Sequence, residues 1–155
     1  MENEYTIKEL IDNIDDVGEL YKTYKDQFEI DDIKYAIEID AKPIEILKHF
    51  KDRFDDDLMR YMAKNIRSIE IADYFYKEYA DKFSKDIIKY IIEDNRYSRF
   101  LKKMFEYLYD KFDKDLIKVA IENSRPIDLQ LLYQKIEDKF DDELKQLYNA
   151  KMQNQ

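Results

Sequence analysis

Apolar side chains recur along this chain with the spacing of one face of an α-helix. From Val17 to Phe28, for example, Val, Leu, Tyr, Tyr and Phe stand at positions i, i+3, i+4, i+7 and i+11. Spacings of three and four residues place all five on one side of a helix. Short polar segments interrupt the pattern at regular intervals, so it predicts amphipathic helices joined by short corners.

Each of these apolar stripes ends in the same phrase, Asp-(Lys/Arg/Gln)-Phe. Its five copies are Asp26-Gln27-Phe28, Asp52-Arg53-Phe54, Asp81-Lys82-Phe83, Asp110-Lys111-Phe112 and Asp138-Lys139-Phe140. Successive Phe residues are 26, 29, 29 and 28 positions apart. A fixed period of this length is the signature of stacked repeats. We expect the repeated Phe to be a core residue.

Each repeat is predicted to hold one helix before the Phe and a second helix after it. A good N-cap residue follows the Phe directly in four repeats, as Asp55, Ser84, Asp113 and Asp141. Thr6-Ile7-Lys8-Glu9 reads as a capping box and predicts a further helix ahead of the repeats. Within the second helices, bases such as Lys34 are expected to pair at i,i+3 with acids such as Asp31.

The predicted fold class is all-α, with about eleven short helices forming five stacked helix-pair repeats of about 28 residues. Either an α-solenoid or a compact helical-repeat bundle fits this pattern. We expect a single domain over 1–155, with an N-terminal helix at 6–15. The predicted repeats cover about 16–42, 43–67, 68–96, 97–125 and 126–152.

Composition narrows the fold and the location. The chain is 41% charged, but it is also 45% hydrophobic and 15% aromatic, so it has enough apolar surface to fold. One Gly and two Pro leave few turn signals, which argues against a sheet. With no Cys, no transmembrane run and an acidic N-terminus unlike a signal peptide, we expect a reducing, cytoplasmic location. Residue usage suggests an AT-rich genome, and for a phage or viral protein the compartment would be the host cytoplasm.

Catalytic and metal-binding motifs are not evident. His49 is the single histidine, and Gly18 alone cannot build a phosphate-binding loop. The acidic runs Asp55-Asp56-Asp57 and Asp141-Asp142-Glu143 lack the ligand spacing of a calcium loop, and N-capping explains them. We therefore expect no enzymatic activity, no cofactor and no metal.

Two charged rows follow from the repeat. A basic row of corner residues comprises Lys42, Arg67, Arg96 and Arg125. It is explained either by charge compensation at helix C-termini or by contact with an acidic or phosphate-bearing partner. The acidic row is the repeated Asp, which the helix dipole disfavours at a C-terminus. This Asp either pairs with a base of a neighbouring corner, begins a tighter turn, is copied passively by duplication, or serves binding.

An aromatic flank is the last candidate feature. On the helix predicted near 98–112, Phe100 and Tyr107 lie away from the Leu101/Leu108 direction. They either pack against a neighbouring helix or, if exposed beside Arg96 and Arg99, form a binding hot spot. The predicted partner-binding residues are Phe100, Tyr107, Arg96, Arg99, Arg67, Arg125, Asp81 and Asp110.

Together these features favour a non-enzymatic, protein-binding helical-repeat protein: a scaffold, an adaptor or an inhibitor that acts by surface occlusion. The net charge of −9 predicts a partner protein with a basic surface and disfavours direct binding to nucleic acid or to a membrane. The alternative is an acidic phage or viral counter-defence inhibitor that occupies a nucleic-acid groove of a host nuclease complex. A steep salt dependence would favour this alternative. The sequence leaves the oligomeric state open.

Overall fold

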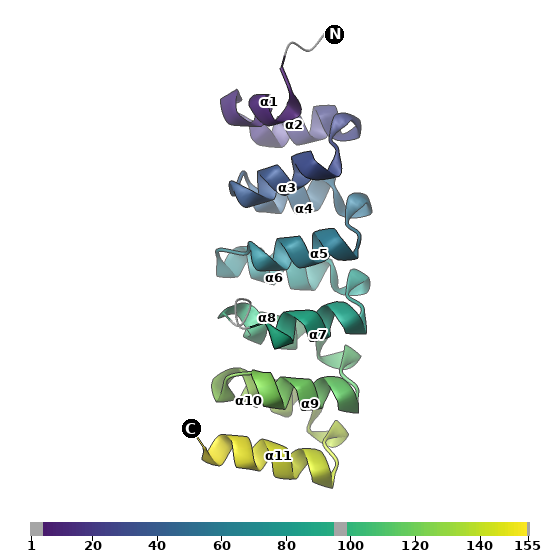
Figure 1. Cartoon of the computed structure of the whole chain (residues 1–155), viewed down its shortest axis with the longest axis vertical. Helices are drawn as coiled ribbons and strands as arrows, with labels where there is room; N and C mark the ends of the chain where they lie inside the picture. The colour runs from purple at the N-terminus through teal and green to yellow at the C-terminus, as the bar shows by residue number, and fades with distance from the viewer. Residues whose placement is uncertain (1–4, 95–98, 155) are drawn as a thin grey trace. The chain divides into compact units, whose positions relative to one another are not determined.

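The computed structural model describes residues 5–94 and 99–154. In these residues all regular structure is helical, with eleven α-helices, short 3-10 helices and no strand (Figure 1). The prediction of an all-α chain is confirmed. The chain divides into two compact units, Met1–Asn65 and Ile66–Gln155, and each is described by itself. The expected single domain stays a prediction.

The first unit holds five α-helices, in which α2 packs against α4, and α3 packs against α1, α4 and α5. In chain order its elements are α1 (Ile7–Asn13), α2 (Val17–Tyr24), η1 (Lys25–Gln27), α3 (Ile30–Glu38), α4 (Pro43–His49), η2 (Lys51–Arg53) and α5 (Asp56–Lys64).

The second unit holds six α-helices in two rows. One row is made by α6, α8 and α10, each of which packs against the next, and the other by α7, α9 and α11. In chain order its elements are α6 (Ile69–Glu78), η3 (Ala80–Lys82), α7 (Lys85–Glu93), α8 (Leu101–Leu108), η5 (Tyr109–Lys111), α9 (Lys114–Asn123), α10 (Pro126–Ile136), η6 (Glu137–Lys139) and α11 (Asp142–Gln153).

The helix starts follow the capping chemistry of the sequence. Thr6 and Glu9 form the predicted capping box, in which each side chain accepts a hydrogen bond from the other residue's backbone N–H. The expected N-caps all accept from the backbone N–H three residues on. These residues are Asp55, Ser84, Asp113 and Asp141. Local sequence therefore fixes where these helices begin.

The repeated Phe is a core residue in every copy, as predicted. Its exposed fraction is 5% or less at Phe28, Phe54, Phe83, Phe112 and Phe140. In the second unit the ring of Phe83 lies against the rings of Phe75 and Tyr76, with centroids 5.2 and 5.4 Å apart. Each repeat thus places one such ring in the apolar core.

The repeated Asp lies in a tighter turn than an α-helix, which confirms one of the alternatives above. In all five copies it is the middle residue of the 3-10 helix that follows the first α-helix of the repeat. Asp52 also confirms the corner-pairing alternative, since its carboxylate lies 3.5 Å from Lys25 Nζ. The base beside this Asp has a structural role in two copies: Lys111 and Lys139 donate to the carbonyls of Phe83 and Phe112.

Several ion pairs join the second helices of successive repeats. Lys34 Nζ lies 2.8 Å from Asp57 Oδ2 on α5. The i,i+3 ion pair expected between Lys34 and Asp31 is therefore wrong. Asp57 raises the pKa of Lys34, through its hydrogen bond first. In the second unit Lys85 and Lys114 make the same kind of contact to acids of the following repeat. These exposed pairs are screened by water and contribute little to stability.

The first unit contains a buried tyrosine whose hydroxyl is a structural donor. Tyr21 is 0% exposed, and its hydroxyl donates a hydrogen bond to the carbonyl of Ala41. Tyr21→Phe leaves that carbonyl without its donor, so we expect the free energy of unfolding to fall by about 1–3 kcal/mol near neutral pH. Urea unfolding followed by circular dichroism measures this loss.

The same residue gives the first unit a pH dependence. Burial raises the pKa of Tyr21 well above its usual value. Just above pH 10 the Tyr21 hydroxyl therefore ionises in the unfolded chain but not in the folded one. The contribution of Tyr21 to the free energy of unfolding is thus fully present below about pH 10. It falls as the pH rises further, by up to ~1.4 kcal/mol per pH unit. Tyr21→Phe should lack this part of the alkaline loss. Tyr24→Phe, which alters a half-buried ring of the same helix, is the control, and equal alkaline loss in both variants would contradict the assignment.

None of the helices in the described residues has the length and apolar content needed to cross a bilayer.

Candidate functional site

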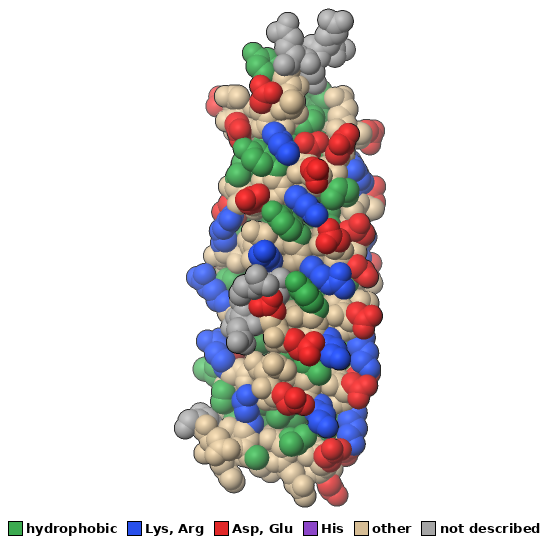
Figure 2. Space-filling view, viewed as in Figure 1, with side chains coloured by type: hydrophobic (Ala, Val, Ile, Leu, Met, Phe, Trp, Pro, Cys, Tyr) green, Lys and Arg blue, Asp and Glu red, His purple; other side chains and the backbone are tan. Residues whose placement is uncertain are grey.

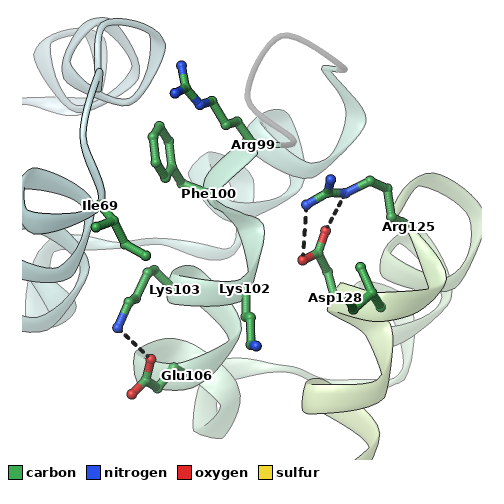
Figure 3. Close-up of a pocket in the computed structure, with 9 residues that line it drawn as sticks. Ile69, Arg99, Phe100, Lys102, Lys103, Glu106, Arg125 and Asp128 are labelled. Atoms are coloured by element: carbon green, nitrogen blue, oxygen red, sulfur yellow. Dashed lines mark hydrogen bonds and ion pairs between the residues drawn. The ribbon is translucent and has the colours of Figure 1, made fainter.

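A hollow of about 380 Å³ opens on the second unit where α8 begins (Figure 3). Its lining comes from the N-terminal parts of three helices, α6, α8 and α10. Because α8 packs against both of the others, the hollow is centred on α8 and flanked by α6 and α10. We call it the α8 hollow.

At the hollow, α8 begins later in its repeat than α6 and α10 begin in theirs. Ile69 and Pro126, the first residues of α6 and α10, each stand fourteen residues before the repeated Phe of their repeat. Leu101, the first residue of α8, stands only eleven residues before its Phe. Three residues of helix correspond to roughly 4.5 Å of rise. The start of α8 therefore falls almost one turn short of its two neighbours.

The walls of the hollow are apolar and open to solvent. Ile69 on α6 is 55% exposed and Ile127 on α10 is 63% exposed. Between these helices the half-buried ring of Phe100 projects from the start of α8, as Figure 3 shows. Large apolar side chains grouped at one exposed site are informative, whereas single exposed ones are not.

Four cations line the hollow, and two of them are neutralised. Lys103 Nζ lies 3.1 Å from Glu106 Oε2, and Arg125 Nε lies 2.9 Å from Asp128 Oδ2 (Figure 3). No carboxylate among the described residues lies within ion-pair distance of Arg99 or Lys102. The Arg99 guanidinium lies 5.2 Å from the centroid of the Phe100 ring. The hollow thus has an excess of two positive charges on a chain whose net charge is −9.

The first turn of α8 adds to this positive potential. Each of the other five α-helices of the second unit carries at least one acid in its first turn, which offsets the positive end of the helix dipole. The first turn of α8 has no acid and holds Lys102 and Lys103 instead. Among the α-helices of this unit, the first turn of α8 is therefore the one where the positive helix end is not offset by an acid.

Asp73 on α6 fixes one side of the hollow. Its Oδ1 accepts hydrogen bonds from Tyr107 Oη at 2.5 Å and from Lys103 Nζ at 3.0 Å. These two bonds, that from Tyr107 first, lower the pKa of the Asp73 carboxyl, and the bond to Asp73 raises the pKa of Tyr107. Lys103 is thereby held between Asp73 and Glu106.

Asp128 forms the opposite side and is unusual because it is a buried carboxylate, only 2% exposed. Arg125 Nε donates to its Oδ2 at 2.9 Å and Arg125 Nη2 to its Oδ1 at 3.3 Å. This two-point contact is the strong form of an arginine–carboxylate pair. The charge of Arg125 is thus directed mainly to Asp128.

The structure brings together three of the predicted partner-binding residues, namely Phe100, Arg99 and Arg125. Tyr107 does not line the hollow but supports it through Asp73 and Lys103. The others lie elsewhere: Arg67 is exposed just before α6, and Asp81 and Asp110 are exposed in η3 and η5. Arg96 lies outside the described residues.

Sequence reasoning missed Ile69, Ile127 and Lys102. Both isoleucines stand within the first two residues of a helix, ahead of the apolar stripe, so the helical periodicity does not assign them to the core. Counting back from the repeated Phe gives no signal either, because Ser98, a good N-cap residue, stands fourteen residues before Phe112 just as Pro126 does before Phe140.

Two other hollows lack this combination of features. One, of about 550 Å³ between α7 and α9, is lined by three lysines and three carboxylates, so its charges balance. The other, of about 420 Å³ in the first unit, is lined by Tyr5, Glu9, Leu10 and Asn13. Within the described ranges no group of three or more His, Asp or Glu side chains is placed to hold a metal ion.

Comparison of the chain with protein-family models, with curated proteins and with solved structures found no match.

Proposed function

We propose that this is a non-enzymatic protein-binding protein, a scaffold, an adaptor or an inhibitor that acts by surface occlusion, and that the α8 hollow contacts its partner. The observation that carries the proposal is the grouping of Ile69, Phe100 and Ile127 around two cations, Arg99 and Lys102, that have no carboxylate partner in the described residues. Aromatic and arginine side chains at an apolar centre are typical of binding hot spots.

A protein partner suits this site better than a polyanion. The net charge of −9 opposes a phosphate backbone, whose binding needs an extended basic surface. On the viewed face of each unit, acidic and basic side chains are interspersed (Figure 2). A partner with a largely basic surface is attracted to the acidic excess, while its contact at the hollow itself is apolar and acidic.

The lack of cysteine suits a reducing compartment, and we propose the cytoplasm as the location, in a host cell if the protein is of phage or viral origin.

The proposal is tested by site-specific crosslinking followed by a binding measurement. A photoreactive amino acid at position 127 is expected to capture a partner that the same group at position 39 does not. Ile39 is a suitable control because it is also exposed, at 43%, but lies in the first unit. The captured protein is then purified, and calorimetry is expected to show at least about tenfold weaker binding to Ile127→Glu, with Ile39→Glu unchanged.

Two outcomes count against this reading. Equal affinity of the purified partner for both variants would show that the hollow is not the contact. If the partner is a nucleic-acid enzyme that high salt or added DNA releases, the acidic-inhibitor alternative replaces the hollow as the explanation.

A further inference from the structure

The α8 hollow is too wide for a single side chain to cover. Ile69 and Ile127 lie on helices separated by α8, and packed helices lie ~8–10 Å apart, so the two side chains stand roughly 16–20 Å from each other. An extended chain rises ~3.3 Å per residue, so about five or six residues cover this distance. The dimensions fit a short extended segment.

The charges lie between the two apolar walls. Arg99 stands just before α8 and Lys102 in its first turn, and their side chains point in opposite directions (Figure 3). Lys103 and Arg125, by contrast, are already paired with Glu106 and Asp128. Added negative charge is therefore needed only beside Lys102, between the two apolar walls, and near Arg99.

We infer that the α8 hollow binds an extended peptide segment of the partner protein in which a carboxylate side chain lies between two apolar side chains. This inference rests on the proposed function and adds the chemistry of the ligand. The apolar side chains cover Ile69 and Ile127, and the carboxylate lies against Lys102, while Arg99 adds positive charge at the edge of the hollow. Phe100 lies at the edge of the hollow near Ile69 (Figure 3), and its contact with the Arg99 guanidinium helps to hold that cation there.

The segment is recognised by its pattern of charge and apolar groups. A basic residue in place of the acid meets Arg99 and Lys102, so like charges oppose binding. An acidic segment without flanking apolar residues leaves Ile69 and Ile127 exposed to water. It then binds only through the attraction between its carboxylates and the cations of the hollow, which salt screens. Binding is expected to weaken with salt moderately, because one or two charges take part.

A peptide selection tests the inference. A library of random peptides of about ten residues, which is longer than the span of the hollow, is selected on the immobilised full-length protein. Enriched peptides are expected to carry Asp or Glu between Leu, Ile, Phe or Tyr. A fluorescein-labelled synthetic peptide of the most enriched sequence then serves as the probe, and its affinity is measured by fluorescence anisotropy.

The decisive comparison uses two exposed lysines of the second unit, each in the first turns of its helix. Lys102→Glu on α8 is expected to weaken binding of the probe at least about tenfold, because it reverses a charge at the centre of the hollow. Lys145→Glu on α11 makes the same change of net charge away from the hollow and should leave the affinity unchanged. Phe100→Ala is a second, independent variant that removes an aromatic ring from the lining of the hollow and is also expected to weaken binding of the probe.

The inference is overturned if the selection enriches no acidic peptide, if the probe binds Lys102→Glu and wild type alike, or if a short oligonucleotide binds the hollow more tightly than the peptide. The proposed function survives the first two results as long as the purified partner still depends on Ile127. If the partner is insensitive to Ile127→Glu while the peptide is sensitive to Lys102→Glu, then the proposed function fails and the peptide site remains.

Discussion

Replacing Phe83 by Ala is expected to lower the free energy of unfolding of the second unit by about 3–5 kcal/mol. The Phe83 side chain is only 3% exposed, and its ring lies against the rings of Phe75 and Tyr76. Alanine removes the apolar area of the ring and leaves a cavity that the surrounding rings fill only in part. Urea unfolding followed by circular dichroism is the appropriate measurement, since the chain has no Trp.

The control for this substitution is Ile127→Ala. Its side chain is 63% exposed, so truncation should change the free energy of unfolding by about 0.5 kcal/mol or less. The two variants separate burial from the general effect of losing an apolar side chain in the same unit. A loss below about 1 kcal/mol for Phe83→Ala would contradict the core position of the repeated Phe.

The features that sequence predicted well are those set by residues close together in the chain. The apolar stripe is read from i,i+3 and i,i+4 spacing, and a cap from a Ser or Asp and the backbone three residues on. The same Phe ends the apolar stripe in all five copies of the repeat, so its burial could be predicted at Phe83 as well as at Phe28. Fold class and helix starts therefore followed from local chemistry.

The features that sequence missed depend on neighbours from different repeats. Lys34 pairs with Asp57 rather than Asp31 because the facing helix α5 brings that carboxylate within 2.8 Å. Lys103 is held by Asp73, which is thirty residues away in the chain. The α8 hollow itself is a difference between three helix starts, and no single helix pattern contains that information. Phe100 of the aromatic flank lines the hollow, but its apolar neighbours Ile69 and Ile127 come from the adjacent helices.

Replacing Arg125 by Ala is expected to destabilise the second unit by about 2 kcal/mol, because it leaves the Asp128 carboxylate buried without its cation. Breaking a wholly buried pair costs about 3–5 kcal/mol. The expected loss is smaller here because the Arg125 side chain is 58% exposed and water can replace part of its contact. Urea unfolding measures the loss, as for Phe83→Ala.

A second substitution identifies the cause of this loss. In the double variant Arg125→Ala with Asp128→Asn, the buried group has nearly the same shape but no charge, so at least about half of the lost stability should return. Arg125→Ala alone should also weaken the acidic peptide, since an unneutralised carboxylate in the wall of the hollow repels it, and the double variant should restore that affinity. If Asp128→Asn restores neither, Arg125 does not act by neutralising Asp128. If it restores stability but not affinity, the neutralisation of Asp128 is structural and the Arg125 guanidinium itself contributes to binding of the ligand's carboxylate.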